Sequence, residues 1–396
     1  MTHPTPKDPI LNLPFALLCL SSLLFSASYN MLIPDLPAYL SSLGGGEYKG
    51  LIIALFTLTA GFSRPFSGKL TDTVGRVPVM AVGSLVCFVC GFLYPILSTV
   101  SGFLFLRLIH GFSTGFKPTA TSAYVADIVP KERWGEALGI YGLCFSTGIA
   151  VGPAIGSFIT SLYSIDVLFY CSSLFALLSI VILMNMKETL KEKQKFKFSL
   201  LKISRRDIID VKVLPAAVVT LLTYVSYGAI LTLVPDWSGH VGVVNKGIFF
   251  MIFTIASLLI RFLAGKISDK HGRVNVCIGG IIILIIAVIM LGFGESKAGL
   301  FAGAVVYGIA TGILSPALNA WTIDLSDPHH RGKAVATMYI ALEAGIGMGA
   351  LFAGWAYQDV ISMVPTILYC SSAVAFVSLL YMFYWKNNND RLARIN

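Results

Sequence analysis

Twelve long apolar runs alternate with short polar stretches along the 396 residues. A helix that crosses the hydrocarbon core of a bilayer needs about 20 residues, and most of these runs reach that length. The runs lie at about 13–40, 50–69, 78–98, 102–126, 136–161, 165–186, 213–235, 247–266, 274–294, 298–323, 333–358 and 362–385. The pattern predicts an all-α polytopic membrane protein with twelve transmembrane helices in two six-helix bundles and no soluble domain.

The longest polar stretch, 187–212, separates the runs into two groups of six. It carries nine basic and four acidic side chains, which is typical of a solvated connection. We therefore expect an N-terminal six-helix bundle over 1–186, a cytoplasmic linker loop over 187–212 and a C-terminal six-helix bundle over 213–396.

An internal repeat relates the two halves. The stretch from Gly68 to Arg76 reads GKLTDTVGR, and 197 positions later the chain reads GKISDKHGR, ending at Arg273. The same offset relates Asp127 to Asp324. Parallel repeats of this kind place a substrate site between the halves, near the middle of the membrane.

Charge and composition narrow the function. Hydrophobic residues make up 56% of the chain and charged ones 12%, against about 25% in soluble proteins. Of the 29 Lys and Arg, 22 lie in the tails and loops of one side, three in the opposite loops and four within the runs. The positive-inside rule then places both termini in the cytoplasm, and the net charge of +9 needs no nucleic-acid partner. We expect a bacterial cytoplasmic membrane protein, monomeric, without disulfides.

Four motifs resemble the major facilitator superfamily over nearly the whole chain. The sequence GKLTDTVGR at 68–76 is similar to the superfamily's loop between spans 2 and 3, with Val77 in place of a second basic residue. Span 5 resembles the glycine-proline motif of the antiporter branch, although Ser157 replaces its final glycine. Span 4 reads RLIHG from Arg107, with His110 where glutamine is usual, and span 1 ends in a paired-proline motif at 34–37.

This resemblance implies two six-helix bundles around a central cavity, alternating access, and export more often than import. The loop and the span 5 glycines are expected to act in gating. An aspartate such as Asp72 suits a helix start, an arginine such as Arg76 suits pairing with an acid such as Asp127, and small residues allow close helix packing. The expected gating residues are Gly68, Asp72, Gly75, Arg76, Asp127, Gly148, Gly152, Pro153, Asp269 and Arg273.

Ionisable residues inside spans are costly and mark functional sites by default. Asp35 and Arg107 fall at matching depth near the outer side, so that a pair separated by helix movement would let Asp35 take up a proton. A static ion pair is the alternative. Glu343 lies near mid-depth and is expected to carry a proton or to bind a cationic substrate. We therefore predict proton coupling by Asp35, Arg107 and Glu343.

Lys117, also near mid-depth, leaves two interpretations open. It is either a counter-ion to Glu343 or the ligand of an anionic substrate; a side chain that reaches toward the cytoplasm is the structural alternative. Aromatic walls with a few polar groups suit a site of broad specificity. The expected substrate-binding residues are Tyr29, Asn30, Lys117, Tyr141, Tyr227, Asn319, Trp321 and Glu343.

The sequence lacks a GxxxxGK[ST] nucleotide loop, so transport has to run on a gradient. We expect no cofactor, no metal and no enzymatic activity. The prediction is a proton-coupled exporter of amphiphilic small molecules that works by alternating access. A carrier for anionic or zwitterionic metabolites, sugars or siderophores is the alternative, whereas a membrane enzyme, a sensor or a passive channel fits the sequence less well.

Overall fold

The computed structural model describes residues 12–130, 133–202, 209–327 and 331–395, and the regular elements of this part are helices. The helices of 18 residues or more in this part are α1 (Leu13–Asn30), α3 (Lys49–Thr73), α4 (Arg76–Leu93), α5 (Val100–Ile128), α6 (Trp134–Leu162), α7 (Ile165–Met184), α8 (Leu214–His240), α9 (Gly247–His271), α10 (Arg273–Phe293), α11 (Lys297–Leu325), α12 (Arg331–Tyr357) and α13 (Val364–Ile395). Among the described residues, ten helical stretches are long and apolar enough to cross a membrane, so the all-α, polytopic architecture is confirmed.

Two of the long helices, α5 and α9, are not among these ten stretches. Helix α5 carries Arg107, His110 and Lys117, and the apolar stretch found among the described residues of α9 is Gly247–Arg261. The count of twelve spans therefore stays a prediction.

The first apolar run differs from its prediction. We expected one helix over 13–40, but α1 ends at Asn30 and a separate short helix, α2 (Leu36–Ser42), follows a turn. Pro34 and Pro37 explain the interruption, because proline removes a backbone donor and disfavours a helical residue before it.

Polar side chains start several of the helices. Thr99, Ser164 and Ser296 each precede a helix and accept a hydrogen bond from the backbone N–H three residues later, at 3.1, 3.3 and 3.1 Å. These residues satisfy donors that have no partner within the helix. Short Ser- or Thr-containing turns thus set where α5, α7 and α11 begin.

By its contacts the chain divides into two units. The first unit contains Met1–Leu36 and Leu58–Ser204, and the second contains Pro37–Thr57 and Arg205–Asn396. Pro37–Thr57, which we call the inserted segment, thus packs with residues far along the chain, and α3 begins in the second unit and continues into the first. These units are defined by contacts, and the predicted division into bundles at 186 and 212 stays a prediction.

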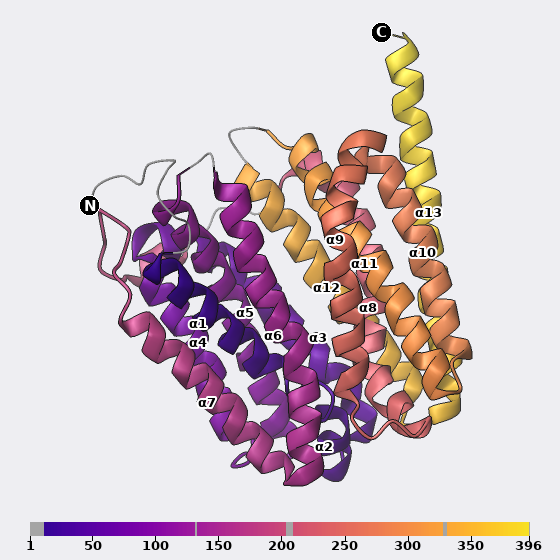
Figure 1. The fold of residues 1–396 in the computed structure, drawn as a ribbon, viewed down its shortest axis with the longest axis horizontal. Helices are drawn as coiled ribbons and strands as arrows, with labels where there is room; N and C mark the ends of the chain where they lie inside the picture. Colours follow the sequence, from indigo (N-terminus) through magenta and orange to yellow (C-terminus); the bar gives the residue numbers. More distant parts are fainter. Residues whose placement is uncertain (1–11, 131–132, 203–208, 328–330, 396) are drawn as a thin grey trace. The chain divides into compact units, whose positions relative to one another are not determined.

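Glycines bring the backbones of α1 and α6 together in the first unit (Figure 1). A Cβ on Gly148 would overlap Ser26 and the Leu23 carbonyl, and one on Gly156 would overlap the backbone of Met31. Gly152 faces Ala27 in the same way, with Pro153 buried beside it. Small residues at such crossings let membrane helices approach closely.

The second unit repeats this device between α8 and α12. A Cβ on Gly345 would overlap the backbone of Leu221, and one on Gly349 would overlap that of Val225. Gly228 of α8 lies against Ile346 of α12 in return. Gly345 and Gly349 are the positions that the 197-residue offset relates to Gly148 and Gly152.

Candidate functional site

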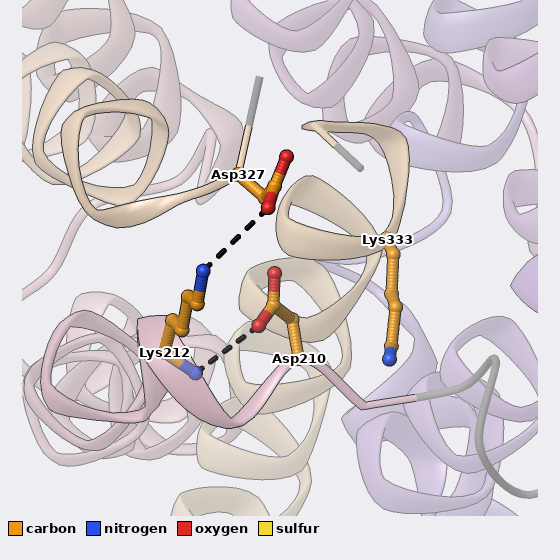
Figure 2. A pocket seen from close by; sticks show the side chains of 4 residues that line it. All are labelled: Asp210, Lys212, Asp327 and Lys333. Atoms are coloured by element: carbon orange, nitrogen blue, oxygen red, sulfur yellow. Dashed lines mark hydrogen bonds and ion pairs between the residues drawn. The ribbon is translucent and has the colours of Figure 1, made fainter. Parts of the chain in front are cut away.

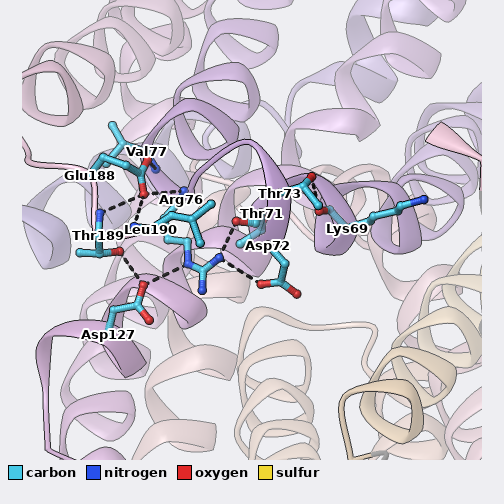
Figure 3. Close-up of polar contacts among 10 residues, drawn as sticks. All are labelled: Lys69, Thr71, Asp72, Thr73, Arg76, Val77, Asp127, Glu188, Thr189 and Leu190. Atoms are coloured by element: carbon cyan, nitrogen blue, oxygen red, sulfur yellow. Dashed lines mark hydrogen bonds and ion pairs between the residues drawn. The ribbon is translucent and has the colours of Figure 1, made fainter. Parts of the chain in front are cut away.

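Arg76 is the centre of a polar network at the turn between α3 and α4 (Figure 3). Its Nε lies 3.0 Å from Asp127 Oδ2, and its Nη1 lies 3.1 Å from Asp72 Oδ1 and 2.6 Å from the Thr71 carbonyl oxygen. The ion pair between Arg76 and Asp127 is the one that the sequence led us to expect. It ties the start of α4 to the end of α5.

Gly75 has a φ of 139°, a conformation that L side chains rarely adopt. This position therefore needs its glycine. Gly68 is different, because a Cβ there would meet no described atom within 4 Å. Gly68 lies inside α3, and its role in gating stays a prediction.

Glu188 completes the network and was missed by sequence reasoning. Its carboxylate accepts hydrogen bonds from the backbone N–H groups of Arg76 and Val77, both at 3.0 Å, and from those of Thr189 and Leu190, both at 2.9 Å. An anion at this place meets the positive end of the α4 dipole. Thr189 donates to Asp127 at 2.5 Å, so the start of the 187–212 linker belongs to the same network (Figure 3).

The second copy of the loop motif makes a corresponding arginine–aspartate contact in the second unit. Arg273 Nε lies 3.2 Å from Asp324 Oδ2, which corresponds to Arg76 and Asp127, and its Nη1 donates to Ser268 Oγ at 3.2 Å. Gly272 has a φ of 83°, again a left-handed conformation. The side chain of Asp269 lies outside the described residues.

Asp35 is buried in the turn between α1 and α2. Its side chain accepts a hydrogen bond from Ser157 Oγ at 3.0 Å, and both residues are less than 10% exposed. Ser157 is the residue that replaces the final glycine of the span 5 motif. The departure from the motif thus supplies a hydroxyl donor to the predicted proton carrier.

Arg107 is 2% exposed and contacts Tyr94, whose hydroxyl lies 3.5 Å from its Nη1. The contact continues into a chain of polar atoms. Tyr94 OH lies 3.0 Å from His110 Nδ1, and His110 Nε2 lies 3.2 Å from Cys87 Sγ. Ser28 Oγ lies 3.3 Å from the same sulfur. His110, another departure from the family motif, therefore links α5 to α4, and Cys87 continues the chain to α1. The pair of Asp35 with Arg107 stays a prediction.

Lys117 is enclosed within the first unit. Its Nζ donates to the Ser21 carbonyl at 3.0 Å and to Ser21 Oγ at 2.8 Å, and it also donates to Ser179 Oγ. The ammonium lies 4.8 Å from the centre of the Phe25 ring, and the residue is 1% exposed. Among the described residues, this lysine contacts hydroxyl and carbonyl oxygens and no carboxylate.

Glu343 on α12 and Tyr227 on α8 both belong to the second unit. Glu343 is 8% exposed and lies close enough to Tyr224 and Tyr227 to act on both electrostatically. The Tyr227 ring also packs against Phe253, with centroids 5.9 Å apart. Glu343 therefore lies within electrostatic range of Tyr227, and the substrate-binding role of both residues stays a prediction.

The other predicted substrate-binding residues make local contacts. Asn30 and Asn319 donate to backbone carbonyls four residues earlier, at 2.8 and 2.9 Å. Trp321 is 3% exposed, and its ring centre lies 4.9 Å from that of Trp385 on α13. Tyr29 packs on Phe25 and Tyr141 on Phe145 within their own helices. The substrate-binding role of these residues stays a prediction.

A small polar pocket lies where the linker enters the second unit (Figure 2). Asp210, Lys212, Asp327 and Lys333 line it. Lys212 Nζ lies 3.6 Å from Asp327, and the backbone N–H of Asp210 donates to Thr337 Oγ1 at 2.9 Å. The hydrogen bond of Asp210 therefore attaches the end of the linker to α12. The mixed charges of the pocket do not suit an amphiphilic substrate.

A family model supports these observations. The model described as the Major Facilitator Superfamily matches residues 18–240 and 216–394. The chain belongs to this superfamily. It is a member of a transporter family and an integral membrane protein.

Individual members of the superfamily give the same picture. The chain is 25% identical over 331 residues to an uncharacterised MFS-type transporter of Methanocaldococcus jannaschii, covering 81% of this chain and 85% of the relative. It is 26% identical over 309 residues to the multi-drug resistance efflux pump PmrA of Streptococcus pneumoniae, covering 75% and 77%.

A solved structure supports the fold. The crystal structure of the human organic anion transporter MFSD10 resembles this chain with a TM-score of 0.71 and 18% identity, covering 93% of this chain and 98% of that one. At that identity the likeness concerns the fold alone.

Proposed function

We propose that this protein is a proton-coupled exporter of amphiphilic small molecules that works by alternating access. In this proposal twelve helices span the cytoplasmic membrane of a bacterium as two six-helix bundles, with both termini in the cytoplasm. The relationship to a multidrug efflux pump, at 26% identity, supports export of small molecules. The paired arginine–aspartate contacts at Arg76 and Arg273, 197 residues apart, support two related halves.

The buried Asp35 carboxylate is the observation that carries the coupling. It lies in the turn that follows α1 and accepts its hydrogen bond from α6, the two helices that the glycines pack together. An ionised carboxylate away from water is costly and relies on the donors around it. A movement of α1 relative to α6 that removed the Ser157 hydroxyl would therefore favour proton uptake by Asp35.

Lys117 counts against the alternative of an anion carrier. An anionic substrate needs a cation that it can reach, but the Lys117 ammonium is held by Ser21 and Ser179 inside the first unit. Glu343, which lies within electrostatic range of Tyr224 and Tyr227, instead suits a cationic amphiphile. We therefore place Glu343 and Tyr227 at the substrate and treat Lys117 as structural.

The test is proton movement in everted membrane vesicles with a preset pH gradient. Ethidium, a lipophilic cation, should dissipate the gradient in wild-type vesicles, and vesicles with Asp35→Asn should not respond. Asp166→Asn is the matched control, since Asp166 is an exposed acid at the start of α7 and should behave as wild type. An Asp35→Asn variant with normal ethidium-driven proton movement would remove Asp35 from the coupling mechanism. A response to organic anions alone would favour the alternative.

A further inference from the structure

Lys49 stands at the centre of a buried polar cluster in the second unit. The residue is 4% exposed and begins α3, within the inserted segment Pro37–Thr57. Its Nζ lies 2.6 Å from Asp236 Oδ2 on α8 and 2.5 Å from Asp359 Oδ1, just beyond α12. One ammonium therefore joins the inserted segment to two helices of the second unit.

Tyr357 makes two contacts within the same cluster. Its hydroxyl donates to Asp236 Oδ2 at 3.1 Å, and its ring centre lies 5.3 Å from Lys49 Nζ, within range of a cation–π interaction. Ser41 adds a hydrogen bond from the inserted segment to Asp359 Oδ2 at 3.3 Å. We call Lys49, Asp236, Tyr357 and Asp359 the clasp.

The backbone after α12 is bent to present Asp359. Gln358 and Asp359 have φ angles of 42° and 62°, in the left-handed region that residues with side chains seldom occupy. Two such residues in succession are strained, and such strain is found where function requires a particular geometry. Here the bend aims the Asp359 carboxylate at Lys49.

Small residues keep the inserted segment and α12 in close contact beyond the clasp. A Cβ on Gly50 would lie 3.0 Å from Gly354 Cα, and one on Gly347 would lie 2.8 Å from Thr57 Oγ1. The contact between the inserted segment and α12 therefore extends along the part of α3 that belongs to the inserted segment. No covalent link within the second unit holds it there, because the chain enters the segment from the first unit and leaves it toward the first unit.

This connectivity restricts how the molecule can move. If the two units change position during transport, either α3 bends between Thr57 and Leu58 or the inserted segment leaves the second unit. The part of α3 around this division is regular helix, and its proline lies farther along, at Pro65. Sharp kinks in helices occur mainly at proline and at a few other defined features. Release therefore fits better than bending.

We propose that the clasp is a releasable closure, in which Lys49 positions the inserted segment on the second unit and must part from Asp236 and Asp359 in each transport cycle. The transport cycle in this inference rests on the proposed function. The existence of two positions of the inserted segment does not depend on it. The cost of separating the ions sets how often the segment leaves. This cost is the lost attraction between the charges, and hydration of the freed charges offsets part of it.

A reversible cross-link separates release from bending. In a variant whose native cysteines are replaced and whose ethidium transport is retained, Ser41→Cys and Asp359→Cys are joined with a short bis-methanethiosulfonate. Linked protein should transport at less than a tenth of the rate of the same protein after reduction. The control pair is Asn275→Cys with Lys386→Cys, which joins α10 to α13 within the second unit at a native contact of 2.8 Å. Linking the control pair should leave transport unchanged.

A second experiment needs no substrate. Spin labels at Ser42 in the inserted segment and at Val244 in the second unit, both exposed, report the distance between them by pulsed electron paramagnetic resonance. Lys49→Met should add a longer distance to the single distance of the parent, whereas Lys49→Arg should retain the short one. If wild-type vesicles move no ethidium, the proposed function fails and these distances still decide the clasp. Full transport by the Ser41–Asp359 linked protein, or one unchanged distance in Lys49→Met, would overturn the inference.

Discussion

Two lysines, Lys49 and Lys117, are buried to nearly the same degree but are held in different ways. Lys49 is 4% exposed and contacts two carboxylates, whereas Lys117 is 1% exposed and contacts hydroxyl and carbonyl oxygens and an aromatic ring. Lys49 joins separate stretches of chain that could part. Lys117 lies among α1, α5 and α7 of one unit. Burial of a charge therefore does not define its role. The role depends on the chemistry of its partners and on how they are connected along the chain.

The same substitution at both lysines should give the largest contrast. Lys49→Met leaves Asp236 and Asp359 without their cation, and the loss of one partner of a buried ion pair costs about 3–5 kcal/mol. We expect a cost of about 3 kcal/mol to the closed clasp, because Asp359 is itself 47% exposed by side chain. The spin-label distances of the Lys49→Met variant measure this shift.

Lys117→Met should have little effect on the same readouts. Ser21 Oγ and Ser179 Oγ lie 2.9 Å apart and can bond each other without the ammonium, so no carboxylate is left behind. The unfolding temperature of the purified variant in detergent should be equal to that of wild type or higher, with ethidium transport retained. A loss of ethidium transport with a normal unfolding temperature would show that Lys117 acts in the cycle.

A double variant sharpens the result at Lys49. Lys49→Met with Asp236→Asn removes both charges of the more buried pair, so the closed clasp should recover about half of the stability lost in Lys49→Met. Spin-label distances in the two single variants and the double variant form the cycle. Equal shifts in Lys49→Met and in the double variant would mean that Asp236 is not the partner that matters.

Glycine substitutions compare the two regions a second time, with a smaller effect. A Cβ on Gly156 overlaps Met31 within the first unit, so Gly156→Ala should destabilise the protein by about 1–3 kcal/mol. A Cβ on Gly50 of the inserted segment overlaps Ala350 on α12. Gly50→Ala should therefore open the clasp, with a smaller fall in unfolding temperature than Gly156→Ala. Gly139→Ala is the control, because an added Cβ there would meet no atom of the described residues within 4 Å outside its own helix. Equal loss of stability in Gly50→Ala and Gly156→Ala would contradict the difference.

The two arginines of the repeated loop should differ as well. The side chains of the Arg76–Asp127 pair are 13% and 29% exposed, whereas those of the Arg273–Asp324 pair are 25% and 54% exposed. The more exposed pair should contribute less, because water screens it more. Arg76→Gln should slow ethidium transport about tenfold, or about 1.4 kcal/mol, and Arg273→Gln should slow it less. Initial transport rates at matched expression measure both. A larger effect at Arg273 would move the main closing contact to the second unit.

Tyr357→Phe should have the smallest effect. It removes one hydrogen bond to Asp236 and keeps the ring beside Lys49, which amounts to about 1 kcal/mol. The spin-label distances should shift by less than in Lys49→Met. A shift as large as that of Lys49→Met would make the hydroxyl, and not the ammonium, the main link of the clasp.

The helices were predictable because burial in a bilayer requires long apolar runs, and these are local in sequence. The pairing of Arg76 with Asp127 was also accessible, since both belong to a repeated pattern. The break after Asn30 was missed although Pro34 and Pro37 signalled it.

Other features depend on contacts between distant stretches. The Ser157 hydroxyl meets Asp35 only after α6 packs on α1, and Glu188 reaches the start of α4 only after the linker folds back. The enclosure of Lys117 by Ser21 and Ser179 likewise had no local pattern. Two of the three departures from the family motifs, Ser157 and His110, were the signals available for such contacts.

The central claim is that this chain alone exchanges protons for an amphiphilic substrate. The most direct measurement is ethidium movement by the purified protein in liposomes that carry a pH gradient and no other ion gradient. We predict that ethidium accumulates on the acidic side above its equilibrium level, and that a protonophore abolishes the accumulation. Movement of ethidium only down its own gradient, unaffected by the protonophore, would contradict proton-coupled export.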